Sequence, residues 1–311
     1  MANPSAAAPS VGLHQRPGLA GRLDLPKRFT FAAAALVVVL VALLLSFIGW
    51  NGTQVLAVPG ESIGALFGPT WTPSATPAAF GILPFILGTL GVMVVAAIIA
   101  APLSIGLAVF MAEVAPPWAK AITRPAMEVF VGIPSVVYGF LGLSILVPFL
   151  AHNFRWLGFS VGYSWFAGSL VLALMILPTV ASIAYDALLA VPAELRSASL
   201  ALGTTRWQTI RHILLPAARG GILTAVILGM MRAAGEALAV QMVIGNRPTI
   251  PTGLTDPLTT LTAQITLDMG NTTSAETWNK VLWTMGLVLL LMSFSFVILA
   301  RYLGRQRTQP A

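Results

Sequence analysis

Leu83–Ala101 reads LPFILGTLGVMVVAAIIAA, an apolar run without a charged residue. A helix needs about 20 such residues to cross the hydrocarbon core of a bilayer. Apolar sequence continues beyond this run to Met111, and Pro102 is a position where a kink is expected. Residues 102–113 therefore either prolong one long tilted helix or form a short bent extension of it. The run itself predicts a membrane-spanning helix.

The rest of the chain has the same character. Hydrophobic residues make up 57% of the 311 residues and charged residues only 9%, against roughly 25% charged in a soluble domain. A water-soluble globule could not cover its surface with so few charges. The fold class is therefore all-α, a polytopic membrane protein with about six transmembrane helices. The predicted spans are Phe29–Gly49, Leu83–Ala101, Phe130–Ala151, Trp165–Ala187, Gly221–Ile244 and Val281–Ala300.

The basic residues indicate the orientation. Thirteen of the 17 lie before the first span, between spans two and three, between spans four and five, or after the sixth. With six spans these segments share one side, and basic residues favour the cytoplasmic side. Both termini are therefore predicted to be cytoplasmic. The net charge of +7 is then a topology signal, and no nucleic-acid partner is expected.

The spans divide the chain into segments. The first span is longer than the apolar part of a cleavable signal, so it is predicted to be a retained anchor. The two periplasmic segments are too short for a core of their own and are expected to be surface loops. The predicted segments are a cytoplasmic tail (1–28), the anchor (29–49), a periplasmic loop (50–80), a core (81–303) with a cytoplasmic loop (188–219) and a second periplasmic loop (246–279), and a cytoplasmic tail (304–311).

Several kinds of chemistry are absent from the sequence. The chain has no cysteine, which excludes thiolate metal sites and cysteine nucleophiles. The three histidines are scattered, and no metal site is expected. No glycine-rich phosphate loop with its lysine is present, so the chain itself is not expected to use ATP. We find no serine–histidine–aspartate arrangement and no paired carboxylates, and predict that the chain is not an enzyme.

The cytoplasmic loop contains the most informative stretch, residues 191–219, VPAELRSASLALGTTRWQTIRHILLPAAR. It predicts two short helices broken at Gly203, a residue that suits a left-handed helix end. Glu194 lies where the first helix favours an acid. Thr205 and Gln208 form a capping box that starts the second helix, and Pro216 is expected to end or bend it.

The second helix is amphipathic. Trp207, Ile210 and Leu214 share one face, whereas Arg206 and Arg211 do not. Two interpretations follow from this pattern alone. The hairpin rests on the lipid surface, or it inserts into a partner protein and transmits movement.

The same loop resembles a motif of the inner-membrane permease subunits of ABC importers, E-A-A-x3-G-x9-I-x-L-P. Both spacings are kept here, although serines replace the glutamate and the second alanine, and Glu194 lies one turn upstream. In that family the element is a coupling helix seated in a groove of a cytoplasmic ATPase, on a type I (MetI-like) fold. The resemblance implies that coupling involves Glu194, Ser197, Ala198, Ser199, Gly203, Thr205, Arg206, Trp207, Ile213, Leu215 and Pro216.

Three further stretches are similar to phosphate importer permeases of the PstC type: residues 229–240 (GMMRAAGEALAV) with 243–246 (VIGN), residues 80–86 (FGILPFI) and residues 133–139 (IPSVVYG). The resemblance covers roughly residues 71–303. It implies half of a phosphate pathway in a bacterial inner membrane. It also implies a PstA-type sister permease, a PstB-type ATPase dimer on which ATP and magnesium act, and a periplasmic PstS-type phosphate-binding protein. The chain itself would hold no cofactor.

Arg232 and Glu236 lie within the fifth predicted span, where a charge costs a few kcal/mol. At i and i+4 of one helix they share a face and can neutralise each other. One interpretation is a structural ion pair. The other is an anion pathway, because arginine binds two phosphate oxygens at once and a carboxylate can accept a hydrogen bond from protonated phosphate. The PstC resemblance implies the second role.

Weaker pathway candidates are Ser135 and Tyr138 near Pro134, which offer hydroxyls, and Asn246 and Arg247 at the outer end of the fifth span. Glu128 is interpreted as an acid at the N-terminus of the third span. Two alternatives for the function stay open: an ABC importer permease for another solute, or an ATP-independent secondary carrier or channel.

Overall fold

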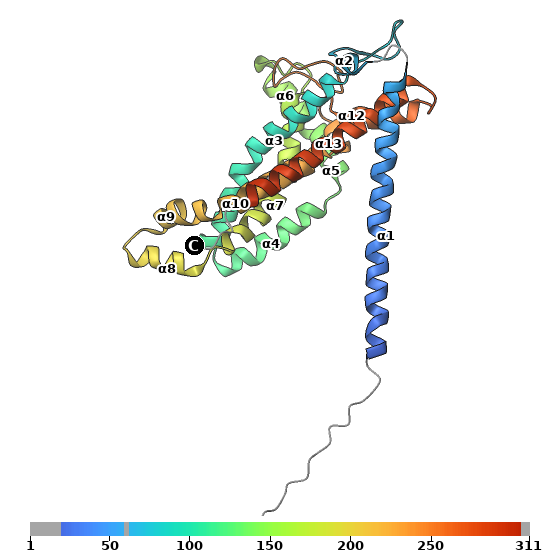
Figure 1. Cartoon of the computed structure of the whole chain (residues 1–311). Coiled ribbons are helices and arrows are strands. Elements are labelled where there is room, and N and C mark those ends of the chain that lie inside the picture. The colour runs from blue at the N-terminus through green and yellow to red at the C-terminus, as the bar shows by residue number, and fades with distance from the viewer. Residues whose placement is uncertain (1–19, 59–61, 306–311) are drawn as a thin grey trace, which may run out of the picture. The chain divides into compact units, whose positions relative to one another are not determined.

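The computed structural model describes residues 20–58 and 62–305 (Figure 1). The chain divides into two units, one that ends at Gly49 and one that begins at Trp50. The first contains most of helix α1 (Ala20–Thr53), whose described apolar side chains are largely exposed. Helix α1 begins at Ala20, so residues 20–28 of the predicted cytoplasmic tail are helical. The rest of that tail, and residues 306–311 of the C-terminal one, lie outside the described residues.

The described residues contain six helical segments long and apolar enough to cross a membrane, which confirms the predicted number. Their ends shift by up to roughly fifteen residues from the prediction, most in the fifth. The segments are Lys27–Ala57, Leu83–Val114, Ser135–Asn153, Trp165–Leu189, Arg206–Ala234 and Thr277–Tyr302. Helix α3 (Leu83–Val109) runs through Pro102 into the π-helical segment η2 (Phe110–Val114), so the single long helix is the correct alternative.

The third span is interrupted at its start. Helix α4 (Pro117–Gly132) ends before Pro134, and the chain then continues through α5 (Ser135–Leu141), the π-helical η3 (Gly142–Leu146), α6 (Val147–Asn153) and η4 (Arg155–Leu157). Proline disfavours a helical conformation in the residue before it, and Ile133 is extended, with ψ 128°. The crossing therefore begins at Ser135, not at Phe130 as predicted.

The second cytoplasmic helix and the fifth span are continuous. Helix α9 (Arg206–Thr209) passes through the π-helical η5 (Ile210–Leu214) into α10 (Leu215–Ala234). Pro216 has no N–H, and its ring would crowd the carbonyl four residues earlier. The wider π turn, in which the Leu215 N–H bonds to the Ile210 carbonyl, accommodates this proline. Of the two predicted outcomes, that Pro216 ends the helix or bends it, the first was wrong.

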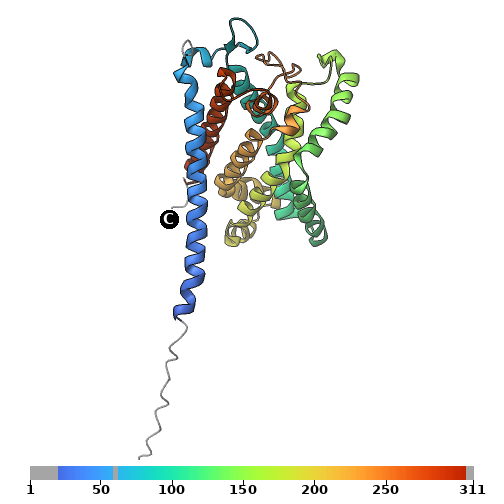
Figure 2. The same cartoon turned by 90° about the vertical axis from the view of Figure 1, so that its right-hand side faces the viewer.

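The core forms where α3, α7 (Trp165–Leu189) and α10 pack together, with the most extensive contact between α3 and α7. Small residues allow the close approach that is typical of membrane helices. A Cβ atom on Gly229 would lie 2.4 Å from the Val180 side chain. Figures 1 and 2 show that α4 and α8 (Ala193–Ala201) lie at one end of this core, whereas α6 and α12 (Leu261–Asp268) lie at the other.

The two predicted periplasmic loops are partly built into the bundle. The first contains η1 (Gln54–Ala57), α2 (Ile63–Leu66) and a two-stranded antiparallel sheet of β1 (Trp71–Thr72) and β2 (Ala79–Phe80). Trp71 packs edge-on against Phe80 and Phe85, at ring distances of 5.9 and 5.0 Å. Together with residues of α12 and α13 (Thr277–Arg305), this segment forms a second hydrophobic cluster.

The second loop enters the bundle between α11 (Leu238–Gln241) and η6 (Met269–Asn271). Leu258, Leu261 and Ala263 are completely buried. The Thr259 carbonyl lies so close to α3 that a Cβ atom on Gly88 would be 2.1 Å from it. The Leu261 N–H donates to the Thr89 hydroxyl at 2.9 Å. The expectation of a surface loop was therefore wrong for residues 258–264, which pack as part of the core.

Candidate functional site

The fifth predicted span breaks at the residues that carry its charges. Helix α10 ends at Ala234, and Glu236 lies in the non-helical step before α11. Its carboxylate accepts a hydrogen bond from the Ala239 N–H at 3.2 Å, and its carbonyl accepts one from the Thr262 hydroxyl at 2.7 Å. Both bonds replace partners lost where the helix is interrupted. Glu236 therefore connects the non-helical step after α10 to α11 and to the buried segment at residues 258–264.

Arg232, in the last turn of α10, does not pair with Glu236. Its guanidinium donates to the Thr179 hydroxyl of α7. Among residues 20–58 and 62–305, the one ion pair joins Arg196 to Glu113. The expected neutralisation of Arg232 by Glu236 along one helix face was wrong, because the helix ends between them. A half-buried arginine that is bonded to a neutral hydroxyl keeps its positive charge available to a ligand.

Tyr138 lies beside the break in the third span. Its hydroxyl donates to the Phe130 carbonyl at 2.9 Å, across the interruption between α4 and α5. Ser135 is the first residue of α5 and is half-buried. Helix α5 packs on α11, where a Cβ atom on Gly139 would come within 2.8 Å of Ala239. The two interrupted spans thus meet, which brings Tyr138 and Arg232 into one region.

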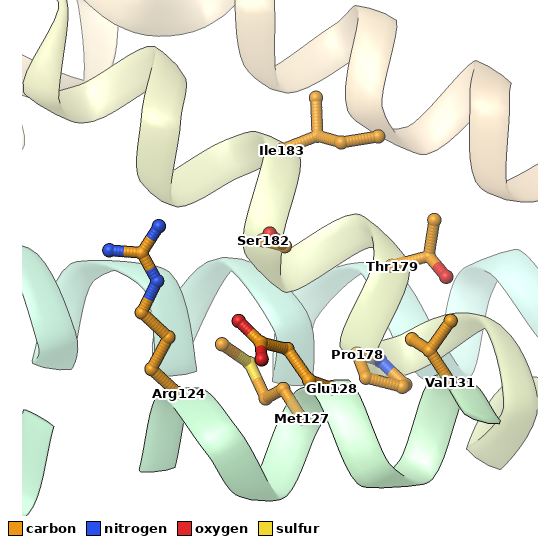
Figure 3. A pocket seen from close by; sticks show the side chains of 8 residues that line it. All are labelled: Arg124, Met127, Glu128, Val131, Pro178, Thr179, Ser182 and Ile183. Carbon is orange, nitrogen blue, oxygen red and sulfur yellow. The ribbon is translucent and has the colours of Figure 1, made fainter. Parts of the chain in front are cut away.

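A cavity of about 370 Å³ opens between α4 and α7. Figure 3 shows the Arg124 and Glu128 side chains rising from α4 toward α7, where Ser182 and Thr179 lie. Its apolar lining consists of Met127, Val131, Pro178 and Ile183. Thr179 is thus shared by this cavity and by the hydrogen bond to Arg232. Sequence reasoning missed Arg124, Thr179 and Ser182 as site residues, because their spacing on two helices carries no local motif.

Glu128 was also misplaced by the sequence. It lies in the last turns of α4 and not at the N-terminus of a span, because α4 begins at Pro117. An interpretation as a helix-capping acid therefore does not apply. Its carboxylate lines the cavity instead.

Asn246 and Arg247 follow α11, on the other side of the helix break from Arg232. Gly245 and Asn246 have φ values of 85° and 51°, a left-handed turn that glycine and asparagine tolerate. The Asn246 amide donates to the Gln241 carbonyl at 2.9 Å, and both residues line a second cavity of about 470 Å³. Arg247 is exposed and does not line it. The structure therefore brings Arg232, Glu236 and Tyr138 together and leaves Asn246 and Arg247 apart from them.

The predicted hairpin of α8 and α9 is confirmed in its local details. Gly203 is left-handed, with φ 81°, and both bonds of the Thr205–Gln208 capping box are present. Ser199 is buried, and its hydroxyl bonds to those of Thr204 and Thr209 at 2.8 and 3.0 Å. A side chain in place of the motif's second alanine thus joins the two helices of the hairpin.

The hairpin also exposes a surface. Of the three residues predicted to share one face, Ile210 and Leu214 are buried, whereas Trp207 is 62% exposed; Leu202 is 85% exposed. Of the remaining motif positions, Ile213 and Leu215 are half-buried, and the exposed ones are Glu194, Ser197, Ala198, Arg206 and Pro216. Exposed apolar side chains on a polar element are typical of an interaction site.

The fold and the hairpin define a multi-pass membrane permease of the ABC importer class. The chain belongs to the family of binding-protein-dependent transport system inner membrane components, whose model matches residues 104–309. Members of this family are transporter subunits. Together with the six apolar spans, this membership places the chain in the inner membrane as a multi-pass protein.

Two relatives illustrate the likeness. The chain is 50% identical to the probable ABC transporter permease protein YqgH of Bacillus subtilis, over 90% of each chain. It is 35% identical to the phosphate transport system permease protein PstC of Xylella fastidiosa, over 88% of this chain and 87% of that one. The predicted likeness to PstC-type permeases is confirmed.

Solved structures share the fold. A bacterial alginate ABC transporter in complex with an alginate pentasaccharide-bound periplasmic protein matches with a TM-score of 0.62 at 15% identity, over 93% of this chain and 98% of that one. The MetNI methionine ABC transporter in inward-facing conformations matches with a TM-score of 0.53 at 20% identity, over 72% and 96%. At these identities the likeness concerns the MetI-like fold alone.

Proposed function

We propose that the chain is half of the pathway of an ATP-driven importer for inorganic phosphate. The observation that carries this proposal is the position of Arg232, a half-buried guanidinium that donates to the Thr179 hydroxyl and forms no ion pair with a carboxylate of the described residues. A planar guanidinium suits a tetrahedral oxyanion, because it donates to two oxygens at once. The similarity to PstC permeases supports phosphate as that anion.

Three partners complete the proposed transporter. A sister permease of the PstA type supplies the other half of the pathway, and a periplasmic protein of the PstS type delivers phosphate. An ATPase dimer of the PstB type, on which ATP and magnesium act, receives the α8–α9 hairpin. The exposed Trp207 and Leu202 side chains support this contact. The orientation follows from the charges: the hairpin, with its basic residues, and both termini are cytoplasmic.

Uptake of labelled phosphate by cells that contain the whole transporter tests the proposal. Arg232→Ala is expected to abolish uptake, and Arg232→Lys to leave a small fraction, since an ammonium is a point charge without the planar fork. Arg155→Ala is the matched control, because Arg155 is exposed in η4, away from the pathway. Co-purification of the other subunits with each variant shows that the complex is assembled. Normal uptake by assembled Arg232→Ala would contradict the proposal.

An ABC permease for another solute is the alternative. An arginine in a hydroxyl-rich site also suits sulfate and other oxyanions. Competition separates the two: excess unlabelled phosphate, but not sulfate, is expected to block uptake of labelled phosphate. An ATP-independent carrier or channel is set aside by the family to which the chain belongs.

A further inference from the structure

The cavity between α4 and α7 combines groups that a simple structural contact does not need. One guanidinium, one carboxylate and two hydroxyls, from Arg124, Glu128, Thr179 and Ser182, line one side of it. Its volume of about 370 Å³ gives room for roughly ten waters. Arg124 and Glu128 are exposed on α4, a helix outside the six candidate spans, so both charges are open to water. This cavity therefore has the composition of a small hydrated anion site.

The cavity is connected to Arg232 through one side chain. Thr179 lines the cavity and accepts the hydrogen bond from Arg232. Ser182 follows Thr179 by three residues on α7, so the two hydroxyls share a helix face. An anion that leaves Arg232 meets these hydroxyls and then Arg124. Because α4 and α8 lie at the same end of the core, this route leads toward the hairpin end (Figures 1 and 2).

We propose that this cavity is a second binding station for phosphate, at which Arg124 binds the anion and Glu128 selects its protonated form. The inference rests on the proposed function. Phosphate keeps at least one proton at neutral pH and sulfate keeps none. The phosphate hydroxyl donates to the Glu128 carboxylate, whereas sulfate offers that carboxylate only lone pairs and is repelled.

In this proposal Glu128, and not Glu236, accepts the hydrogen bond from protonated phosphate. The Glu236 carboxylate is already engaged by the Ala239 N–H at the helix break. Glu128 and Arg124 are four residues apart on α4, and both point into the cavity. A carboxylate beside the arginine also keeps the positive potential shallow, so the ion is released.

The absence of cysteine from the chain makes a direct test possible. Val131 lines the cavity without a polar role, so Val131→Cys places one thiol there with little change in volume. Ser160→Cys, at an exposed position outside the cavity, is the control. Both variants are purified as assembled complexes. The rate at which a water-soluble anionic thiosulfonate modifies this chain is then measured by mass, with inorganic phosphate or sulfate present.

Phosphate at roughly ten times its dissociation constant is expected to slow the modification of the Val131→Cys variant about tenfold. It is expected to leave the modification of the Ser160→Cys variant unaffected, and sulfate is expected to protect neither thiol. Adding Arg124→Gln to Val131→Cys removes the protection by phosphate. Adding Glu128→Gln allows sulfate to protect as well. The proposal is overturned if phosphate does not protect the thiol of Val131→Cys, or if sulfate protects it while Glu128 is still present.

Uptake of labelled phosphate by the Val131→Cys transporter separates the two proposals. Normal uptake without protection overturns the second station and leaves the proposed function intact. If the unsubstituted transporter takes up no phosphate, the proposed function fails, whatever the protection experiment shows.

Discussion

The Arg196 guanidinium of α8 donates to the Glu113 carboxylate of η2, the π-helical continuation of α3, with 2.5 Å between Nη2 and Oε1. The two residues are 83 positions apart in the sequence. Their side chains are 32% and 13% exposed. The pair therefore connects the hairpin to the long helix α3, in addition to the covalent connection between α8 and α7.

Neutralising one member of this pair is expected to uncouple ATP hydrolysis from transport. A hydrogen bond between charged groups contributes about 1.5–3 kcal/mol, and partial exposure favours the lower end. Glu113→Gln or Arg196→Gln should therefore lower phosphate uptake per ATP hydrolysed by about tenfold. The ratio is measured on the complex in proteoliposomes. The double variant Glu113→Arg with Arg196→Glu should recover part of the coupling. Equal ratios in all variants would show that the pair transmits nothing.

Gly88 is expected to tolerate no side chain. A Cβ atom there would lie 2.1 Å from the Thr259 carbonyl, so Gly88→Ala must displace the buried segment at residues 258–264. Overpacking of this kind costs about 1–3 kcal/mol. Gly106, in the same helix, has nothing within 4 Å of the position of an added Cβ atom. Gly106→Ala should therefore stabilise the folded protein by about 0.5–1 kcal/mol. Thermal unfolding in detergent measures both. A Gly88→Ala variant as stable as Gly106→Ala would contradict the close packing.

The Thr179 hydroxyl is expected to matter through its hydrogen bond to Arg232. Thr179→Val keeps the shape of the side chain but removes the acceptor, which leaves the guanidinium without this partner. Such a loss costs about 1–3 kcal/mol, so uptake should fall roughly tenfold or more. Thr179→Ser keeps the hydroxyl and should retain most of the uptake. If the valine and serine variants transport equally well, the hydroxyl has no part in the pathway.

We expect the loop at residues 252–256 to be sensitive to acid because of Asp256. Hydrogen bonds from the Thr252 hydroxyl, at 2.6 Å, and from the Thr252 and Gly253 N–H groups, at 2.8 and 3.0 Å, hold the pKa of Asp256 below its ordinary value of 3.8. A lowered pKa stabilises the loop above that ordinary value, and the contribution is lost as the pH falls through the lowered pKa. Protection of the Thr252 and Gly253 amides from hydrogen exchange should therefore persist near pH 5 and fall below about pH 4.

Asp256→Asn is the comparison for this prediction. An asparagine oxygen accepts more weakly and does not titrate, so the variant should show low protection that does not change over the same pH range. The loop also accepts hydrogen bonds from the first N–H groups of α7, where Trp165 donates to the Asp256 carbonyl at 2.8 Å. Acid should thus loosen the start of α7 as well. A pH-independent protection in the unsubstituted chain would contradict this account.

The features that depend on residues close together in the sequence, the spans and the cytoplasmic hairpin, could be predicted from the sequence. Six long apolar runs predicted six spans, because crossing a bilayer requires length and hydrophobicity and little else. The hairpin followed from Gly203 and from the Thr205–Gln208 box, whose hydrogen bonds span only a few residues. Periodicity placed Trp207, Ile210 and Leu214 on one face, but it could not show which of them the bundle buries. Ile210 and Leu214 are buried, and Trp207 is exposed.

Features that depend on distant residues were not predictable. Alanine, glutamate and leucine around Gly235 favour a continuous helix, and the break there is stabilised by Thr262, 26 residues after Glu236. The burial of residues 258–264 depends on the absence of a side chain at Gly88. The cavity of Arg124 and Glu128 exists only because α4 and α7 pack together. Each of these features requires a contact between segments that the sequence does not relate to each other.

The π turn before Pro216 keeps the hairpin rigidly connected to the fifth span. Because the helix is not cut at the proline, Arg206 and Arg232 stand at the two ends of one rod, about 40 Å long at 1.5 Å per residue. A tilt of roughly 5° at the hairpin end then moves the far end by about 3–4 Å, more than the length of a hydrogen bond. A tilt of this size at the hairpin end is therefore enough to separate Arg232 from Thr179.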